Sequence, residues 1–392
     1  MPMDKKGFGK GWLLLGLLMM VLSGCGGAAK KAARPAQFAY AGDLNGHSAI
    51  LTRFADGTGE TTLTDGSGND SSPVWSPDGT KLAYLTHQDG NPAIALINAD
   101  GSLATGVTAG PGEMQMLRWS PDGRQISFVK RDGGVRELKS MQTDGTGTAE
   151  MADLLMDPQV LNWSPDSRRL AFIQNLEKDE GLFIIGRDGS GLKKLTTQAG
   201  LLRSMSFSPD SCWIAFSQAS PAGKVDDQIY KVRVDGSGLT QLTETQGRNM
   251  VVAWYPDGKH LLTGSTRDGP WQIYRLDPDG SNPVNLSNNS AGDIPIGFSP
   301  DGKKIAYVLK QTGSEELYVM NPDGSGQRQV TSLGEIISQV FWSAEGGYFN
   351  LSTNLDSNFK PENWRNWVVS LDGSFKMEVS QYAGLSPLAW RP

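Results

Sequence analysis

The stretch Trp75-Ser76-Pro77-Asp78-Gly79, followed closely by the apolar triplet Leu82-Ala83-Tyr84, decides the fold because it returns throughout the chain. Its leading aromatic residue returns at spacings of 44, 44, 44, 47, 44 and 44 residues, at Trp119, Trp163, Phe207, Trp254, Phe298 and Trp342. Ser-Pro-Asp follows five of these seven aromatic residues, and the degenerate copy Ser343-Ala344-Glu345 follows the last. A fixed period of this length indicates one supersecondary unit that is repeated along the chain.

Each unit has the same parts in the same order. Ser-Pro-Asp-Gly fits a type I turn, because proline fixes φ at the second position. The apolar triplet predicts a short strand buried on both faces. An Asp-Gly pair then marks a tight hairpin, as at Asp100 and Asp188, and supplies the positive φ that such a turn requires. Four strands in about 44 residues are typical of one blade of a β-propeller.

The two ends of the repeat region complete one another. Phe38-Ala39-Tyr40 matches the apolar triplet but lacks a leading strand, and Leu388-Ala389-Trp390 supplies one. We therefore predict an all-β, eight-bladed propeller of four-stranded blades over residues 38–392, closed by pairing the C-terminal strand with the N-terminal blade. The recurring aromatic rings are expected to fill the gaps between blades, as core residues.

Residues 1–24 have the features of a secretory signal, with Lys5, Lys6 and Lys10 before an apolar run over 12–22. Eleven residues at about 1.5 Å each cover only about half of a bilayer core of roughly 30 Å. The run ends in Leu22-Ser23-Gly24-Cys25, which resembles the bacterial lipobox and implies lipidation of Cys25. The alternative is an ordinary signal peptide with an incidental cysteine. Residues 25–37 then form the lipidated cysteine and a flexible tether.

The signal segment and the lipobox-like sequence predict a lipid-anchored protein of the bacterial cell envelope that faces away from the cytoplasm. The membrane is the outer one if there are two, and otherwise the cell membrane, on its outer face. With 36 Lys and Arg against 42 Asp and Glu, the net charge of −6 offers no basic surplus for nucleic acid. We expect a monomer.

Catalytic and metal-binding motifs were sought without success. The chain has no Gly-x-Ser-x-Gly elbow, and its histidines, His47, His87 and His260, fall in different units. The recurring aspartates are interpreted as turn residues rather than metal ligands. Cys212 is interpreted as a small packing residue. We therefore predict no metal, no cofactor and no enzymatic activity.

The repeated Trp-Ser-Pro-Asp-Gly with Leu-Ala-Tyr resembles the WD-like propeller repeat of the TolB family, and of the propellers in tricorn and prolyl oligopeptidase-type peptidases. The TolB family has an α/β domain before a six-bladed propeller, whereas this chain has a tether and eight units. The resemblance therefore implies a TolB-like propeller that is not TolB itself.

Positions that differ between equivalent units are candidates for function, because the structural demand is the same in each copy. The loops that enter the innermost strands carry polar residues expected to ring one mouth of a central channel, namely Asp70, Glu113, Asp157, Arg203, Arg248, Asn249, Asp293 and Glu335. Arg118 and Asn162 stand just before the recurring aromatic, where other units have mostly small or apolar residues. The long loop over 353–366, with Phe359, Trp364 and the adjoining Trp367, is expected to offer a contact surface for protein or glycan; the alternative is that these aromatic residues cap the seventh unit, whose turn motif is degenerate.

A mixed-charge mouth of this kind suits a protein or peptide partner, and ordinary solvated surface charge is the alternative. We therefore predict a non-catalytic binding protein. The alternatives are a propeller enzyme of the glycan lyase, hydrolase or peptidase type, or a glycan-binding module, acting through the central channel. An enzyme would place two channel carboxylates about 5–9 Å apart.

Overall fold

The computed structural model describes residues 35–392, except 89, 110, 145–146, 176–179, 197–199, 220–225, 312–313, 356–359, 361–362 and 381–387. The signal segment, Cys25 and the tether up to residue 34 lie outside the described residues, as does Phe359. Within the described part, no helix has the length and apolar character needed to cross a membrane.

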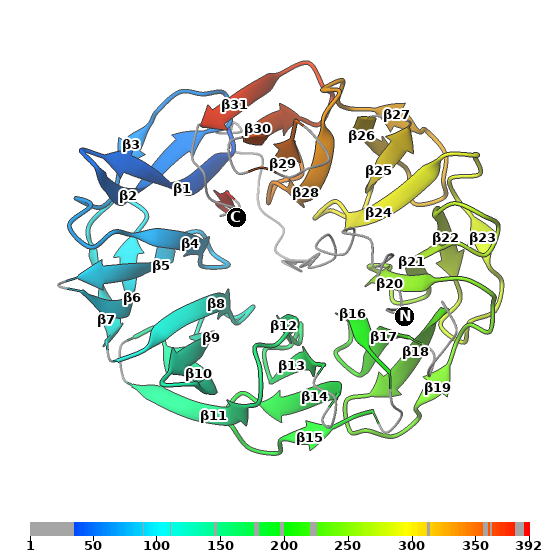
Figure 1. Cartoon of the computed structure of the whole chain (residues 1–392), viewed down its shortest axis with the longest axis horizontal. Helices are drawn as coiled ribbons and strands as arrows, with labels where there is room; N and C mark the ends of the chain where they lie inside the picture. The colour runs from blue at the N-terminus through cyan, green and yellow to red at the C-terminus, as the bar shows by residue number, and fades with distance from the viewer. Residues whose placement is uncertain are drawn as a thin grey trace, which may run out of the picture.

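The described residues form eight four-stranded antiparallel sheets, arranged as blades around one axis (Figure 1). Blade 1 contains β32 (Ala389–Trp390), β1 (Gln37–Leu44), β2 (His47–Phe54) and β3 (Thr61–Thr62), and blade 2 contains β4 (Ser71–Trp75), β5 (Lys81–Gln88), β6 (Asn91–Asn98) and β7 (Leu103–Ala109). Blade 3 contains β8 (Glu113–Trp119), β9 (Gln125–Asp132), β10 (Val135–Gln142) and β11 (Thr148–Leu154), and blade 4 contains β12 (Val160–Trp163), β13 (Arg169–Gln174), β14 (Gly181–Gly186) and β15 (Lys193–Lys194).

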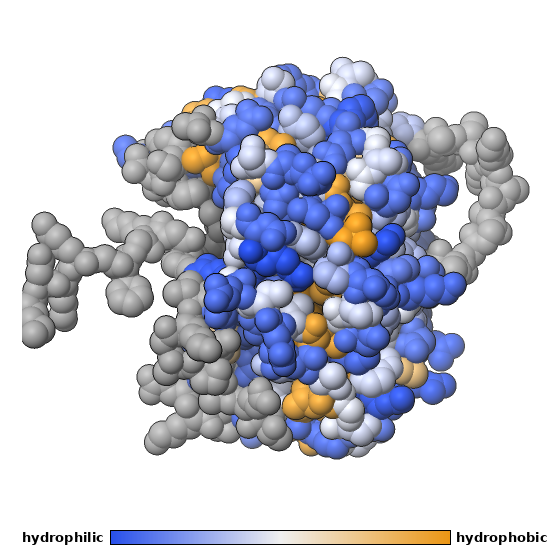
Figure 2. Space-filling model, turned by 90° about the vertical axis from the view of Figure 1, so that its right-hand side faces the viewer, coloured by the Kyte–Doolittle hydropathy of each residue, from blue (hydrophilic) through white to orange (hydrophobic). Residues whose placement is uncertain are grey.

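Blade 5 contains β16 (Leu202–Phe207), β17 (Trp213–Ala219), β18 (Asp227–Arg233) and β19 (Thr240–Gln241), and blade 6 contains β20 (Asn249–Trp254), β21 (Leu261–Ser265), β22 (Gln272–Leu276) and β23 (Val284–Asn285). Blade 7 contains β24 (Gly292–Phe298), β25 (Ile305–Gln311), β26 (Ser314–Met320) and β27 (Arg328–Gln329), and blade 8 contains β28 (Ile336–Trp342), β29 (Tyr348–Asn354), β30 (Trp364–Ser370) and β31 (Lys376–Ser380). The first strand of each blade lies innermost and the last lies on the rim. In the side view, apolar residues on the surface are scattered among hydrophilic ones (Figure 2).

The ring closes through the short strand β32, as the sequence predicts. Its two residues pair with β1, with Trp390 opposite Phe38 and Ala389 opposite Ala39. The Trp390 ring meets the fully buried Phe38 ring edge-on, with 5.5 Å between ring centroids. The predicted eight-bladed architecture and its closure are therefore confirmed.

The recurring aromatic residues join neighbouring blades by hydrogen bonds as well as by packing. The indole N–H of Trp119 donates to the carbonyl of Val74 in the preceding blade at 3.0 Å, and Trp163 donates to Arg118 in the same way at 3.2 Å. Trp75 and Trp254 repeat this bond to Ala389 and Ser206. These bonds satisfy inner-strand carbonyls that have no strand partner on the side of the axis.

The Ser-Pro-Asp-Gly turns are held by their own aspartates. In the first of them, the Ser76 hydroxyl donates to Asp78 at 2.6 Å, and the backbone N–H of Thr80 donates to the same carboxylate oxygen at 3.0 Å. Gly79 has a φ of +66°, which a glycine adopts without strain. The aspartates are therefore turn residues, as predicted from the sequence.

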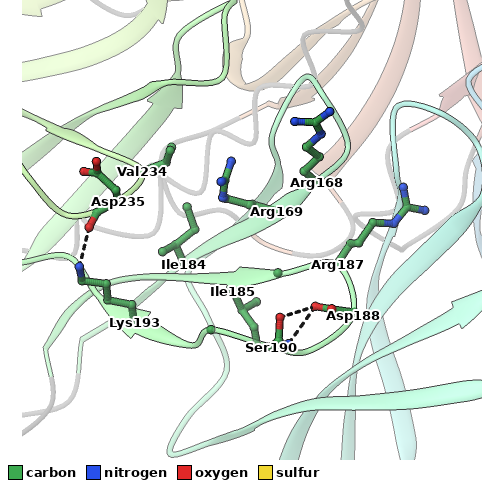
Figure 3. Close-up of a pocket in the computed structure, with 12 residues that line it drawn as sticks. Arg168, Arg169, Ile184, Ile185, Arg187, Asp188, Ser190, Lys193, Val234 and Asp235 are labelled. Carbon is green, nitrogen blue, oxygen red and sulfur yellow. Dashed lines mark hydrogen bonds between the residues drawn. The ribbon is translucent and has the colours of Figure 1, made fainter.

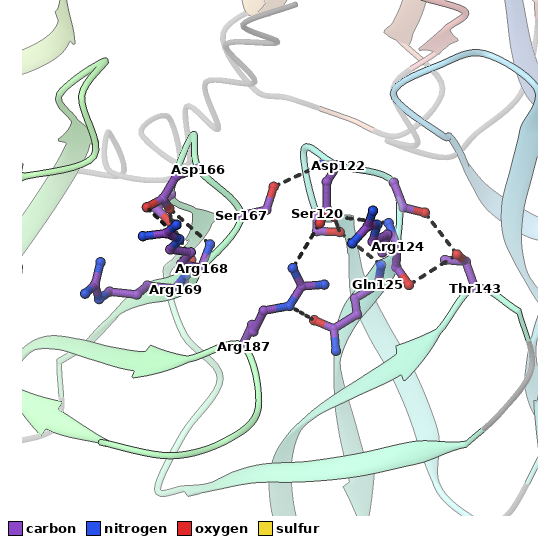
Figure 4. A network of polar contacts seen from close by, with 12 residues as sticks. Ser120, Asp122, Arg124, Gln125, Thr143, Asp166, Ser167, Arg168, Arg169 and Arg187 are labelled. Carbon is purple, nitrogen blue, oxygen red and sulfur yellow. Dashed lines mark hydrogen bonds and ion pairs between the residues drawn. The ribbon is translucent and has the colours of Figure 1, made fainter.

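These turns define one end of the ring, here called the turn face, and the opposite end, where the inner strands begin, is the mouth face. Neighbouring turns are linked, because the backbone N–H of Asp122 donates to the hydroxyl of Ser167 at 2.9 Å (Figure 4). Strand β1 begins on the turn face, since Arg391 donates both to the Gly79 carbonyl and to the Gln37 side chain, each at 2.8 Å.

Candidate binding site on the inner strands

The predicted site residues lie on the inner strands or directly before them. In blades 2 to 8 the inner strand runs from the mouth face to a Ser-Pro-Asp-Gly turn or a variant of it, so residues near the starts of these strands lie on the mouth face around the axis (Figure 1). Arg118 and Asn162 stand further along their strands, one position before Trp119 and Trp163. The structure thus brings the predicted residues to one set of strands, while individual side chains differ in burial and partners.

Two of the mouth carboxylates form ion pairs with the second and third strands of a blade. Glu113 is exposed and lies 3.3 Å from His87 Nε2, which belongs to the preceding blade. Asp157 binds Arg131, whose Nε donates to Asp157 Oδ1 at 2.8 Å, and lies 3.5 Å from Arg136 Nε. These pairs are partly exposed to water, so each contributes little to stability.

The two mouth arginines of blades 5 and 6 converge on one buried carboxylate. Arg203 Nε donates to Asp227 Oδ1 at 3.0 Å, and Arg248 Nε lies 4.0 Å from Asp227 Oδ2. The Asp227 side chain is 8% exposed, while those of Arg203 and Arg248 are 30% and 28% exposed. The buried carboxylate of Asp227 thus holds both guanidinium groups near the start of the inner strands of blades 5 and 6.

Three predicted residues are buried and serve as hydrogen-bonding centres. The Ser48 hydroxyl donates a hydrogen bond to the backbone carbonyl of Asp70 at 2.5 Å. The Asn249 amide donates to the Asp227 carbonyl at 3.0 Å and accepts the Ser265 hydroxyl at 2.8 Å. Asp293 is fully buried, and its Oδ2 accepts a bond from Asn289 at 2.7 Å, while its Oδ1 has no hydrogen-bond partner in the described part of the chain. Burial raises the pKa of Asp293 above its usual value.

Arg118 is the most unusual side chain of the inner strands. It is partly buried, and desolvation lowers its pKa to about 10, so it stays charged at neutral pH. Its Nη1 donates to the Leu117 carbonyl at 2.7 Å, whereas its Nε has no partner among the described residues. Asn162, partly buried, holds the equivalent position in the next blade. A partly buried cation whose Nε is unpaired favours an acceptor group brought by a ligand.

Glu335 and the aromatic residues expected in the neighbouring loop form one network. Trp364 and Trp367 belong to strand β30, so their placement in a loop was wrong. The Trp367 indole donates to Glu335 at 3.2 Å, and Arg365 Nη1 lies 3.2 Å from the other oxygen of the same carboxylate. Trp367 therefore supports the mouth from within the blade, because strand pairing across β29, β30 and β31 fixes its position.

Other chemically interesting groups lie elsewhere. Glu137, Glu150 and Asp153, on the outer strands of blade 3, have oxygens within 4.8 Å of one another, and Lys139 lies 3.3 Å from Glu137. Cys212 is exposed, so its interpretation as a packing residue was wrong.

Sequence reasoning missed a hollow of about 490 Å³ on the turn face between blades 4 and 5 (Figure 3). Arg168, Arg169, Arg187 and Lys193 line it. These residues are separated by up to 25 positions, and only the folded blade brings them together. The available signal was Arg187, which precedes an Asp-Gly turn where the other units have uncharged residues.

Residues 32–160 match the family model of the TolB beta propeller domain. The matched part of the chain carries a TolB-like repeat, and the described residues form a β-propeller. The resemblance drawn from the Trp-Ser-Pro-Asp-Gly repeat is therefore confirmed. No curated protein matches the chain.

Several solved structures have a similar propeller. An oligogalacturonate lyase in complex with manganese matches with a TM-score of 0.55 and 16% identity, over 86% of this chain and 97% of that one. The β-propeller domain of the Trilobed protease from Pyrococcus furiosus matches with a TM-score of 0.54 and 15% identity, over 80% and 98%. Dipeptidyl peptidase 4 from Porphyromonas gingivalis matches with a TM-score of 0.55 and 15% identity, over 79% of this chain and 53% of the peptidase. At such identities the likeness establishes the fold, which hosts many functions.

Proposed function

We propose that the protein is a lipid-anchored propeller of the bacterial cell envelope that binds a protein or peptide partner on its inner strands without catalysing a reaction. The observation that carries this proposal is Arg118, a charged and partly buried guanidinium on an inner strand, whose Nε has no hydrogen-bond partner among the described residues. A backbone carbonyl or a carboxylate of a peptide would satisfy that donor.

The neighbouring charges support a polar partner. Glu113 and Asp157 offer acceptors near the start of the inner strands of blades 3 and 4, and Arg203 and Arg248 offer donors in blades 5 and 6. A partner with both signs of charge would therefore find complementary groups across the mouth face.

The anchor is part of the same proposal and rests on the Leu22-Ser23-Gly24-Cys25 resemblance to the lipobox. Several acyl chains on Cys25 would hold the protein stably, since each buried CH₂ contributes about 0.8 kcal/mol. A Cys25→Ser variant is then expected in the soluble fraction, whereas the unchanged protein sediments with membranes. Equal sedimentation of both would contradict the anchor and leave the binding proposal standing.

The binding proposal is tested by affinity capture from a native envelope extract. Three immobilised proteins over residues 26–392 are compared: the unchanged sequence, Arg118→Gln, and the control Arg124→Gln on the turn face. We expect one partner, identified by mass spectrometry, to be retained by the unchanged protein and by the control and lost from Arg118→Gln, with all three melting cooperatively. Equal retention by all three would contradict the site. If no protein is retained, the glycan-binding and enzymatic alternatives are tested next, with glycan arrays and lyase, hydrolase and peptidase substrates.

A further inference from the structure

The hollow between blades 4 and 5 has the composition of a ligand site and lies on the turn face, away from the mouth residues. Arg168 enters it from the turn between β12 and β13, Arg169 from the start of β13, and Ile184 forms part of its base from β14 (Figure 3). Val234 and Asp235, which follow β18, form the wall contributed by blade 5. Its volume of about 490 Å³ is in the range of pockets that hold small ligands or the end of a peptide.

The basic side chains of the hollow are unequally neutralised. Arg187 is held by blade 3, with Nη1 2.9 Å from Asp122 Oδ2 and Nε donating to Gln125 at 3.2 Å (Figure 4). Lys193 donates to the backbone carbonyl of Asp235, which carries no net charge. Arg168 is 78% exposed and lies 4.0 Å from Asp166. Within the described residues, no hydrogen bond or ion pair engages the guanidinium of Arg169.

The acidic residues of the hollow are already occupied. Asp188 accepts bonds from the N–H and the hydroxyl of Ser190, at 3.0 and 2.7 Å. Asp235 is bound in the same way by Ser237, at 2.8 and 2.7 Å. Hydrogen bonds of this kind lower the pKa of both carboxyl groups, so both are ionised at neutral pH. Arg187 and Arg168 each have a carboxylate nearby, Asp122 and Asp166, so Arg169 is the guanidinium of the lining that has no ion-pair partner within the described residues.

The repeat shows that the fold does not require this charge. The residue before the Asp-Gly turn is uncharged in every other unit, namely Ala55, Ala99, Thr143, Val234, Pro278, Pro322 and Leu371. Arg187 is the exception, and Arg169 follows Arg168 directly in the same blade. Arg187 therefore adds a cation that the other units lack at this position, next to the basic pair Arg168-Arg169, which has a counterpart in Lys303-Lys304 of blade 7.

Apolar groups beside Arg169 narrow the chemistry of the ligand. Ile184 lies at the base, 3% exposed, and the partly buried Val234, which packs against the same apolar cluster, stands near Arg169 (Figure 3). Leu192, at the edge of the same turn, is 51% exposed. A guanidinium binds a carboxylate through two parallel hydrogen bonds, and apolar neighbours favour an apolar side chain next to that carboxylate.

We propose that this hollow binds the free C-terminal carboxylate of a peptide or protein whose last side chain is apolar. Arg169 receives the carboxylate, Arg168 adds a second donor, and the terminal side chain lies between Ile184 and Val234. This site is separate from the mouth residues, so the proposed partner binding there does not depend on it.

The test uses fluorescein-labelled pentapeptides that end in Leu or Lys, each as the free acid and as the C-terminal amide, with binding followed by fluorescence polarisation. The Leu free acid is expected to bind best, with at least a tenfold loss on amidation. Arg169→Gln is expected to weaken its binding at least tenfold, because a charge-assisted pair is lost. Lys81→Gln, the equivalent position in blade 2, is the matched control and is expected to bind as the unchanged protein does.

Thermal melting shows whether weaker binding by Arg169→Gln comes from the loss of a ligand contact or from unfolding of the variant. The Arg169 side chain makes no bond within the described residues, so Arg169→Gln is expected to melt with the unchanged protein. Equal binding of acid and amide, unchanged binding by Arg169→Gln, or no binding at millimolar peptide would each overturn the proposal. So would displacement of the Leu peptide by an equal concentration of inorganic phosphate, since the hollow would then be a phosphate site.

Discussion

The hydrogen bonds between blades can be tested by a matched pair of substitutions, Trp119→Phe and Trp342→Phe. Both rings are partly buried at equivalent positions of the repeat, but only Trp119 donates its indole N–H to the preceding blade, at 3.0 Å from the Val74 carbonyl. The Trp342 N–H is buried without a partner in the described structure. Phenylalanine fits this position, because Phe207 and Phe298 occupy it in two other blades.

The two substitutions remove the same atoms, so the loss of packing is similar and the hydrogen bond makes the difference. Trp119→Phe removes a bond with a net contribution of about 1 kcal/mol and leaves the Val74 carbonyl unpaired. Trp342→Phe removes a buried N–H whose unpaired state costs about 1–3 kcal/mol. We therefore expect Trp119→Phe to be less stable than Trp342→Phe by about 2–4 kcal/mol.

The assay is urea unfolding followed by far-ultraviolet circular dichroism, with calorimetry to check that each variant unfolds in one transition. Each variant lacks one tryptophan, so optical baselines are comparable. Equal midpoints, or a lower midpoint for Trp342→Phe, would refute the idea that indole donation links the blades.

Two further predictions concern pH. Hydrogen bonds from Ser370 and Ser374 hold the pKa of Asp372 at about 2, and the Ser102 hydroxyl and N–H lower the pKa of Asp100. Because the folded pKa lies below the unfolded value of about 3.9, this stabilisation is present above pH 4 and is lost as the pH falls toward 2. Thermal midpoints are therefore expected to drop steeply between about pH 4 and pH 2, and a flat profile would contradict this prediction. Asp293 has the opposite effect, since burial raises its folded pKa and its ionisation therefore costs stability above pH 4. At pH 7 the melting temperature of Asp293→Asn is expected to equal or exceed that of the unchanged protein, and at pH 3 the two are expected to be the same. A lower melting temperature of the variant at pH 7 would contradict this prediction.

The fold was predictable because each repeat of about 44 residues contains all the sequence features that define one blade. The aromatic spacing, the Ser-Pro-Asp-Gly turn and the split unit at Phe38 and Trp390 determine the blade, the blade number and the closure. Each follows from local turn chemistry and from the need to pair every strand edge.

The site was predictable only as a set of positions. Arg203 and Arg248 are 45 residues apart, and both reach Asp227 because that residue begins β18, next to two inner strands. A register shift, such as the one between Leu202 and Ser204, moves a side chain away from the position that the equivalent residue holds in the other repeat units. Burial of Asp293 and Asn249 likewise depends on neighbouring loops, whose lengths differ from blade to blade.

The closure of the ring has a mechanical consequence. Strand β1 is held on both sides, by eight register pairs with β2 and two with β32, so tension applied ahead of Gln37 enters a strand that cannot peel from a free edge. Tension applied beyond Trp390 would act on two register pairs alone. Strand β1 starts beside the Gly79 turn. A propeller that is attached through its N-terminal side is therefore held at the turn face, and its mouth face points toward the surrounding medium. A fusion partner or immobilisation tag is therefore best placed ahead of Gln37.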